Sequence, residues 1–314
     1  MAMCQCGIFC NCNGSCDFCL IENSNFANMD VICEQLVATS KNIDFIAEQE
    51  DNWTNKFRDG ISLLGGELFY IMDERYKELF MKLIDKVIDK VIKPSDNPLI
   101  KFSTVTNGFY DPESLLFPVI DKLRDSVGLQ HVDVNFSYDF KYRFKTPEQE
   151  KRVRDTINAF HERYNYRTGI QMILTQDLIN KILYEGWRPS RWIEETLPGN
   201  QLALLYPHPI HRGNKFSGEK NLDGFNFTRD SLFEALKILK EEEPIIYEAF
   251  ISSCQHSAVY KYTMLYDKDL DEHQAPRLSD GKEIINPKCG HSILYQCYSD
   301  TDKCMMCDLE AMEI

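Results

Sequence analysis

Several features are missing from this chain of 314 residues, and each absence narrows what the protein does. No stretch approaches the roughly 20 consecutive apolar residues that a membrane-spanning helix needs. The first residues lack a basic segment followed by an apolar core, so we recognise no secretory signal and expect a reducing, cytoplasmic compartment. The sequence also shows no low-complexity tract and no internal repeat.

Positive charge is scarce as well. The sequence contains 35 Lys and Arg residues and 49 Asp and Glu residues, which gives a formal net charge of -14. Nucleic-acid-binding proteins usually carry a basic surface, so a long nucleic acid is not the expected partner, whereas a nucleotide remains compatible with this charge. The hydrophobic share of 43% is typical of a soluble globular protein, and the length allows one large domain or two smaller ones.

Cysteine, by contrast, is abundant and unevenly placed. Of the 12 cysteines, only Cys33 and Cys254 lie outside two terminal groups. These groups are Cys4, Cys6, Cys10, Cys12, Cys16 and Cys19 at one end, and Cys289, Cys297, Cys304 and Cys307 at the other. A disulfide framework would spread its pairs through a small secreted chain, so the two groups predict two metal sites.

Three cysteines of the first group, Cys12, Cys16 and Cys19, have the spacing C-x3-C-x2-C. Thiolates at close spacing on one loop are the ligands that hold iron–sulfur clusters. Three thiolates leave one iron of a 4Fe-4S cluster without a protein ligand, and an open metal position is where chemistry takes place. A zinc knuckle is the alternative for the same residues. Cys4, Cys6 and Cys10 do not fit this spacing, and are either buried small residues or ligands of something else.

The hydrophobic pattern behind the cysteine loop alternates between strands and helices. We expect strands at 61–67, 101–108, 132–139, 169–175 and 202–206, and a short one at 7–9 before the loop. Helices are expected at 28–49, 73–93, 112–126 and after Thr146, where Pro147 and Gln149 complete a capping box. Such alternation indicates βα units and a parallel sheet, and six units would form an α/β fold of the partial (βα)6, TIM-like barrel type.

Residues 132–139 alternate strictly between apolar and polar side chains. The polar set is Asp133, Asn135, Ser137 and Asp139. In a partial barrel this face would line an interior that holds a ligand, because an ordinary barrel core is filled with apolar side chains. A half-solvated antiparallel strand gives the same alternation and is the alternative.

After about residue 225 the alternation of expected strands and helices ends. A helix is expected from Thr228 to Leu239 and a helical stretch at 245–266, followed by an acidic loop at 267–287 and the second cysteine group. We therefore expect a partial barrel over 1–225, and a helical region with a small cysteine-rich metal-binding domain over 226–314.

The cysteine loop, with Phe18 just before its third cysteine, is followed by polar motifs at successive strand ends. These are Gly65-Gly66-Glu67, Thr106-Asn107-Gly108, and Ser137 with Asp139. Over roughly residues 5–215 this order resembles the radical S-adenosylmethionine (radical SAM) superfamily. The resemblance implies an oxidoreductase or modifying enzyme with a 4Fe-4S cluster on Cys12, Cys16 and Cys19, and S-adenosylmethionine on the fourth iron. It further implies an electron donor such as flavodoxin or ferredoxin, and a 5′-deoxyadenosyl radical that abstracts hydrogen from a substrate.

The resemblance also implies cofactor-binding roles but assigns no catalytic residue. Gly65 and Gly66 would let the backbone approach the methionyl group, and Glu67 would accept from its ammonium. The other cofactor-binding candidates are Phe18 on the adenine, Ser137 and Asp139 on the ribose, Lys141 or Arg143 on the carboxylate, with Arg143 offering the bidentate fork, and Asn107. The alternatives are a simple turn at 65–67, a cap at 137–139 and a solvated face at Arg143. His208 and His211 fit loop or core positions better than catalytic ones.

The second cysteine group, Cys289-x7-Cys297-x6-Cys304-x2-Cys307, has four thiolates, enough for either zinc or a second 4Fe-4S cluster. It loosely resembles the SPASM and Twitch auxiliary domains, but it lacks the seven-cysteine set of SPASM, and His291 is a possible substitute ligand. An auxiliary cluster favours a peptide or protein substrate, by analogy only. A nucleotide or small-molecule substrate, or a non-catalytic zinc-binding structural protein, are the alternatives.

Overall fold

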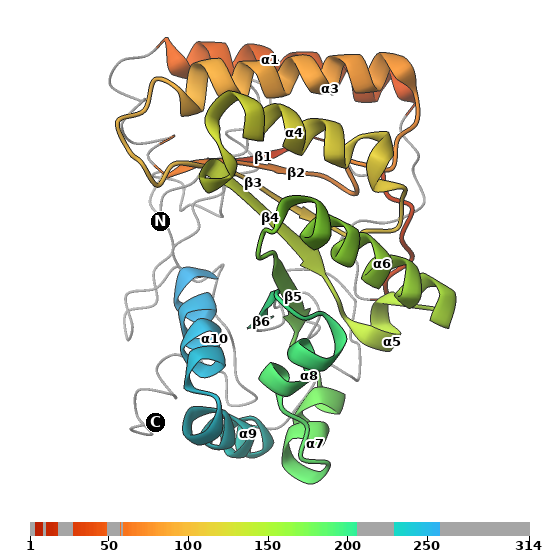
Figure 1. Ribbon diagram of the computed structural model, residues 1–314, viewed down its shortest axis with the longest axis vertical. Coiled ribbons are helices and arrows are strands. Elements are labelled where there is room, and N and C mark those ends of the chain that lie inside the picture. Colours follow the sequence, from red (N-terminus) through yellow and green to blue (C-terminus); the bar gives the residue numbers. More distant parts are fainter. Residues whose placement is uncertain are drawn as a thin grey trace, which may run out of the picture. The chain divides into compact units, whose positions relative to one another are not determined.

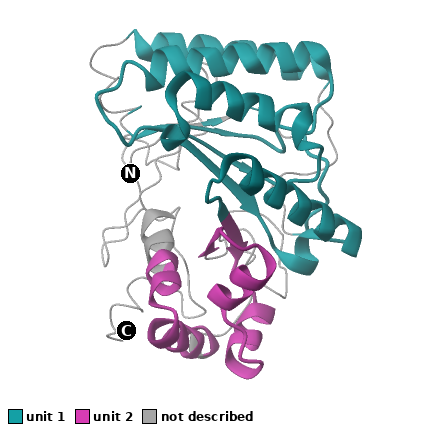
Figure 2. Ribbon diagram, viewed as in Figure 1, with its two compact units in different colours: residues 1–169, 262–274 teal, residues 170–261, 275–314 magenta. Residues whose placement is uncertain are grey.

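The computed structural model of the chain describes residues 4–8, 11–17, 28–48, 57, 59–205 and 229–257. These residues fall into two compact units, one that ends at Gly169 and one that begins at Ile170 (Figure 2). The domain boundary expected near residue 225 lies outside the described residues and stays a prediction, as does the cysteine-rich region at the end of the chain.

The described part of the first unit is built on four parallel strands. They are β1 (Cys4–Gly7), β2 (Gly60–Leu64), β3 (Lys101–Thr106) and β4 (Val132–Ser137). Cys6 pairs with Leu63 in β2, and Thr104 in β3 pairs with Leu63 on one side and Val134 in β4 on the other. With β5 (Gly169–Ile173) and β6 (Gln201–Leu205), the strands follow sequence order in one sheet. This confirms the predicted α/β fold with the strand order of a partial (βα)6 barrel, and excludes the antiparallel alternative for β4.

Helices separate these strands along the chain, as the periodicity predicts (Figure 1). In the first unit they are α1 (Met29–Ala47), α3 (Glu74–Val87) continued by a π-helical turn (Ile88–Ile92), α4 (Leu116–Val127), the short α5 (Phe140–Arg143) and α6 (Pro147–Tyr164). Local capping explains where two of them begin: Asp73 accepts from the Tyr76 N–H at 3.0 Å, and Thr146 accepts from the Gln149 N–H at 3.3 Å. The Gln149 side chain, however, returns to the N–H of Lys145 rather than to that of Thr146.

Alternate residues of the strands have different environments. Phe102, Val134 and Phe136 are fully buried, and the centre of the Phe136 ring lies 6.0 Å from that of Phe160 in α6. The other face of β4 carries Asp133 and Asn135, which are only half-buried. The apolar face therefore forms the core under the helices.

The described residues of the second unit form β6, all of β5 after its first residue, and four helices. These are α7 (Gln176–Tyr184), α8 (Pro189–Thr196), α9 (Arg229–Glu242) and α10 (Pro244–Ser257). The carboxylate of Glu243, between α9 and α10, accepts from the backbone N–H and the hydroxyl of Ser190 at 3.0 and 3.1 Å. It thus satisfies an N–H of the first turn of α8 that has no partner within that helix.

Two details differ from the expected elements. The first strand is Cys4–Gly7 rather than 7–9, so two cysteines outside the metal-binding spacing belong to the sheet. Cys6 is 1% exposed, as expected of a buried small residue. The alternation of β4 ends at Ser137: Asp139, expected to continue its polar face, is 3% exposed and directly precedes α5.

Candidate functional site

Two cysteines of the C-x3-C-x2-C motif lie on the loop that leaves the carboxyl end of β1. Cys12 and Cys16 are both half-buried. Gly14 lies between them: a Cβ at Gly14 would be 3.4 Å from the Cys12 Sγ and 3.7 Å from the Cys16 Sγ. The absence of a side chain at this residue therefore leaves room beside both sulfur atoms.

The loop is held by contacts to two later segments of the first unit. The Asp17 N–H donates to the carbonyl of Tyr142 at 2.9 Å, and the Lys145 ammonium pairs with the Asp17 carboxylate at 2.5 Å. On the other side, the Glu67 N–H donates to the carbonyl of Asn11 at 2.8 Å. The residues that follow β2 and β4 thus fix the position of the cysteine loop.

Among the carboxylates of this region, that of Glu67 has the most strongly shifted pKa. It is 2% exposed and accepts from the Thr106 hydroxyl at 2.9 Å and from the N–H groups of Asn107 and Phe69 at 2.6 and 3.2 Å. Burial raises its pKa to about 7, although these hydrogen bonds and the charge of Arg143 act in the opposite direction. The carboxylate therefore connects the Gly-Gly-Glu turn to the end of β3, and its role as an acceptor for an ammonium group stays a prediction.

Asn107 connects the same strand end to the cysteine loop. Its side-chain N–H groups lie 3.4 Å from the Cys12 Sγ and 3.0 Å from the Asn13 Oδ1. Its Oδ1 accepts from the Phe109 N–H at 2.8 Å, which closes an Asx turn. The structure thus brings this predicted cofactor-binding residue directly against one of the predicted metal ligands.

Asp139 and Arg143, both predicted cofactor-binding residues, form a buried ion pair. The Nε and one terminal nitrogen of Arg143 lie 2.8 and 2.7 Å from the same oxygen of Asp139. Burial disfavours the charged guanidinium, but the charges of Asp139, Cys16 and Cys12 outweigh it, so the pKa of Arg143 is raised. The buried guanidinium is thus electrostatically coupled to both of these cysteines of the motif.

The remaining predicted residues divide into two groups. Gly65, Gly66 and Ser137 are half-buried, with both glycines directly before Glu67 and Ser137 at the carboxyl end of β4. The others lie outside the described residues: Phe18, Cys19, His208, His211, Cys289, Cys297, Cys304 and Cys307. Their roles stay predictions.

Sequence reasoning missed three residues that complete the arrangement. Tyr70 is half-buried, and burial followed by the charge of Cys12 raises its pKa, while a hydrogen bond with Asn11 acts against this rise. Tyr110 is buried with its hydroxyl 2.6 Å from that of Thr106, and Asn13 donates to the Phe109 carbonyl at 2.7 Å. Asn13 lies inside the motif and was visible as a polar residue next to Cys12. The two tyrosines follow Glu67 and Asn107 by three residues without any motif of their own.

The donor set suits an iron–sulfur cluster. Two half-exposed thiols flank a residue without a side chain, and a buried cation offsets part of the negative charge that such a cluster and its thiolates carry. Within the described ranges no three His, Cys, Asp or Glu side chains meet as a metal-binding group, and the third cysteine of the motif is outside those ranges. No helix among the described residues is both long and apolar enough to cross a bilayer.

Comparisons with known proteins give little further information about the function of this site. No family model matches the chain, and no curated protein does. Among solved structures, SuiB of Streptococcus suis aligns with 13% identity and a TM-score of 0.46, over 77% of this chain and 47% of SuiB. The chain thus spans about half the length of SuiB. A fungal β-1,4-galactanase aligns with 12% identity and a TM-score of 0.37, over 67% of this chain and 68% of its own. At such scores neither likeness distinguishes between families, so the functional assignment depends on the residues themselves.

Proposed function

We propose that this protein is a radical SAM enzyme, in which Cys12, Cys16 and Cys19 bind a 4Fe-4S cluster and S-adenosylmethionine occupies the fourth iron. When bound, this pair of cofactors supplies a reductive cleavage of the sulfonium that yields a 5′-deoxyadenosyl radical able to abstract hydrogen from a substrate. The observation that carries the proposal is the arrangement of Cys12 and Cys16 around Gly14, with Asn107 and Arg143 beside them.

The residues around the thiols have distinct tasks in this proposal. The buried positive charge of Arg143 would offset part of the negative charge of a cluster and its thiolates. The half-buried Gly65 and Gly66 have no Cβ, so their backbone permits the close approach of an extended ligand. Asp139 holds Arg143 in place, and a ligand carboxylate would compete with Asp139 for the same guanidinium.

The proposal also covers the substrate class, the electron donor and the second cysteine group. By analogy only, we favour a peptide or protein substrate, with a nucleotide or other small molecule as the second candidate. The electron would come from a protein donor such as flavodoxin or ferredoxin, and Cys289, Cys297, Cys304 and Cys307 would hold a second 4Fe-4S cluster or zinc.

Anaerobic purification and cluster reconstitution test the proposal. The wild-type protein should contain iron and acid-labile sulfide, and should form 5′-deoxyadenosine from S-adenosylmethionine when dithionite is added. Cys16→Ala should abolish this product, since it removes a thiolate ligand. Cys304→Ala should retain the spectrum of the first cluster.

A matched control is Cys33→Ala, because Cys33 is buried in α1 and lies outside the motif. This variant should retain both iron and activity. A colourless protein that contains zinc at Cys12, Cys16 and Cys19 and forms no 5′-deoxyadenosine would refute the proposal in favour of a zinc-binding structural protein.

A further inference from the structure

The side chain of Asn107 is held in one orientation by a closed set of hydrogen bonds. Its Oδ1 faces the Phe109 N–H at 2.8 Å, and its Nδ2 faces the Oδ1 of Asn13 at 3.0 Å. Asn13 in turn donates to the carbonyl of Phe109 at 2.7 Å. Turning the Asn107 amide over would place oxygen against oxygen and N–H against N–H, so the contacts determine which atom is nitrogen.

This orientation directs the same Nδ2 at the sulfur of Cys12, at 3.4 Å. The Gly14 N–H donates to that sulfur as well, at 3.2 Å. Asn107 is 4% exposed, and its backbone N–H is bonded to Glu67 at 2.6 Å, so both ends of the residue are fixed. The Cys12 sulfur thus receives a side-chain hydrogen bond from a buried, pre-oriented donor.

A hydrogen bond to the sulfur of a cluster ligand favours the more electron-rich state of the cluster. Reduction adds one electron, which increases the negative charge on the ligand sulfurs and strengthens each N–H···S bond. Hydrogen bonds to sulfur are among the factors that set the reduction potentials of iron–sulfur clusters. Removing one such donor should therefore make the cluster harder to reduce.

We infer that Asn107 is a positioning residue that raises the reduction potential of the cluster through its hydrogen bond to Cys12, with Asn13 keeping its amide in place. The inference depends on the proposed function, because it requires a cluster on Cys12. It goes beyond that function by assigning to this chain a means of making the first electron transfer easier.

Redox titration of the reconstituted full-length protein, followed by electron paramagnetic resonance, tests this inference. Asn107→Ser removes the N–H donor without adding charge, and a serine oxygen can still accept from the N–H two residues on. At the wild-type midpoint, the ratio of reduced to oxidised cluster in this variant should fall about tenfold, a downward shift of about 59 mV for a one-electron couple. Asn13→Ala should give a smaller shift of the same sign, because it removes the acceptor that orients the amide.

Asn97→Ser is the matched control. Asn97 also closes an Asx turn, accepting from the Leu99 N–H at 2.9 Å, but it precedes β3 whereas Asn107 follows it. Its midpoint should equal that of the wild type.

A fully loaded Asn107→Ser protein with an unchanged midpoint would overturn the inference and leave the proposed function standing. If Asn107→Ser lost its iron, the midpoint of Asn13→Ala would decide, and an unchanged value there would overturn it. A wild-type protein without any cluster would overturn both.

Discussion

At the scale of single residues, Glu67 connects three segments through one buried carboxylate. Its side chain is bonded to the end of β3, and its backbone N–H is bonded to the cysteine loop at Asn11. From the sequence alone, such a glutamate is interpreted as a ligand-binding residue. The sequence does not show that Thr106 and Asn107 donate hydrogen bonds to it. These contacts give Glu67 a structural role that it fulfils whether or not a ligand is bound.

The raised pKa of Glu67 predicts a specific pH dependence of stability. The folded pKa of about 7 lies above the ordinary value of 4.5, so the folded state binds this proton more tightly than the unfolded state. The contribution to the free energy of unfolding is fully present below pH 4.5 and is lost as pH rises through about 7, a change of about 3 kcal/mol. Urea unfolding of wild type and Glu67→Gln, measured at about pH 5 and about pH 8, should show the wild type losing more stability by this order of magnitude. Parallel pH profiles for the two proteins would contradict it.

The ion pair of Asp139 and Arg143 leads to a second prediction. Arg143→Met leaves the Asp139 carboxylate buried without its cation, and we expect the free energy of unfolding to fall by about 3 to 5 kcal/mol. The double variant with Asp139→Asn should recover part of this loss, because it removes the unpaired charge. Strictly additive losses in a urea-unfolding double-mutant cycle would show that the two side chains do not stabilise each other.

At the scale of elements, the start of β2 depends on one glycine. Gly60 has φ +120°, and a Cβ there would lie 1.9 Å from the carbonyl oxygen of Lys101 in β3. Gly60→Ala should therefore cost more than the roughly 1 kcal/mol of the backbone conformation alone, because β3 must also move. Gly186→Ala is the control, since Gly186 also has positive φ (+65°) but no atom within 4 Å of the added Cβ. Equal losses of stability in urea unfolding would contradict the role assigned to the β2–β3 contact.

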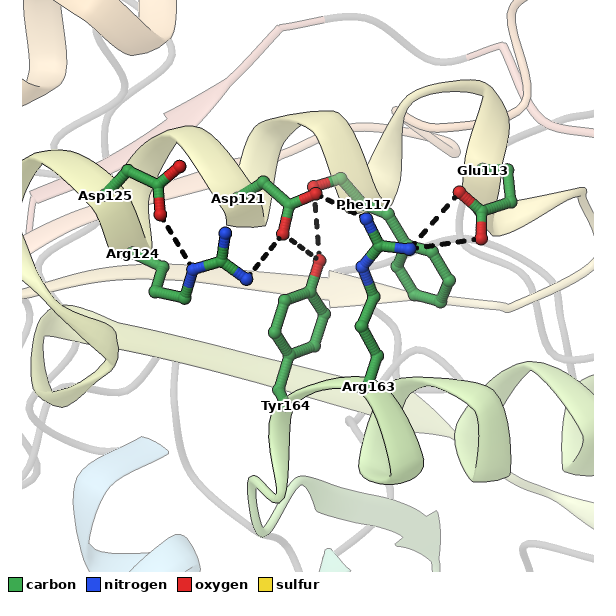
Figure 3. A network of polar contacts seen from close by, with 7 residues as sticks. All are labelled: Glu113, Phe117, Asp121, Arg124, Asp125, Arg163 and Tyr164. Atoms are coloured by element: carbon green, nitrogen blue, oxygen red, sulfur yellow. Dashed lines mark hydrogen bonds and ion pairs between the residues drawn. The ribbon is translucent and has the colours of Figure 1, made fainter.

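A network of charges joins α4 to α6 (Figure 3). Arg163 pairs with Glu113 at 3.2 Å and with Asp121 at 2.6 Å, and its guanidinium lies 4.8 Å from the centre of the Phe117 ring. Arg163→Met should lower the melting temperature more than Lys82→Met, because the Lys82–Glu78 pair is isolated and its side chains are about two-thirds exposed. The difference should shrink as salt is added. Equal melting temperatures for the two variants at low salt would show that the network contributes no more than an isolated pair.

The elements themselves were predictable because their signals are local. The apolar stripe of α3 and the alternation of β4 depend only on neighbouring residues, and both elements form where the sequence predicts them. The pairing of Asp139 with Arg143 was not predictable in the same way. It depends on Phe140, whose positive φ of 43° turns the chain into α5, and on packing that brings α5 beside the cysteine loop.

At the scale of the whole molecule, parallel strand order explains how distant motifs meet. The loops after β1, β2, β3 and β4 leave the same end of a parallel sheet, which places Cys12, Glu67, Asn107 and Arg143 near one another although 131 positions separate the first from the last. Motif order in the sequence predicted this meeting. It did not predict which side chains bind one another rather than a ligand, because that depends on distances that only the folded chain sets.

The most direct test of the central claim is the electron paramagnetic resonance spectrum of the dithionite-reduced wild-type protein, with and without S-adenosylmethionine. We expect the signal of a reduced 4Fe-4S cluster whose g-values change when S-adenosylmethionine is added, because the ligand binds the iron that lacks a cysteine. The Cys12→Ala variant should lack this signal. A cluster signal that S-adenosylmethionine leaves unchanged, or a protein that contains zinc and gives no signal, would contradict the account.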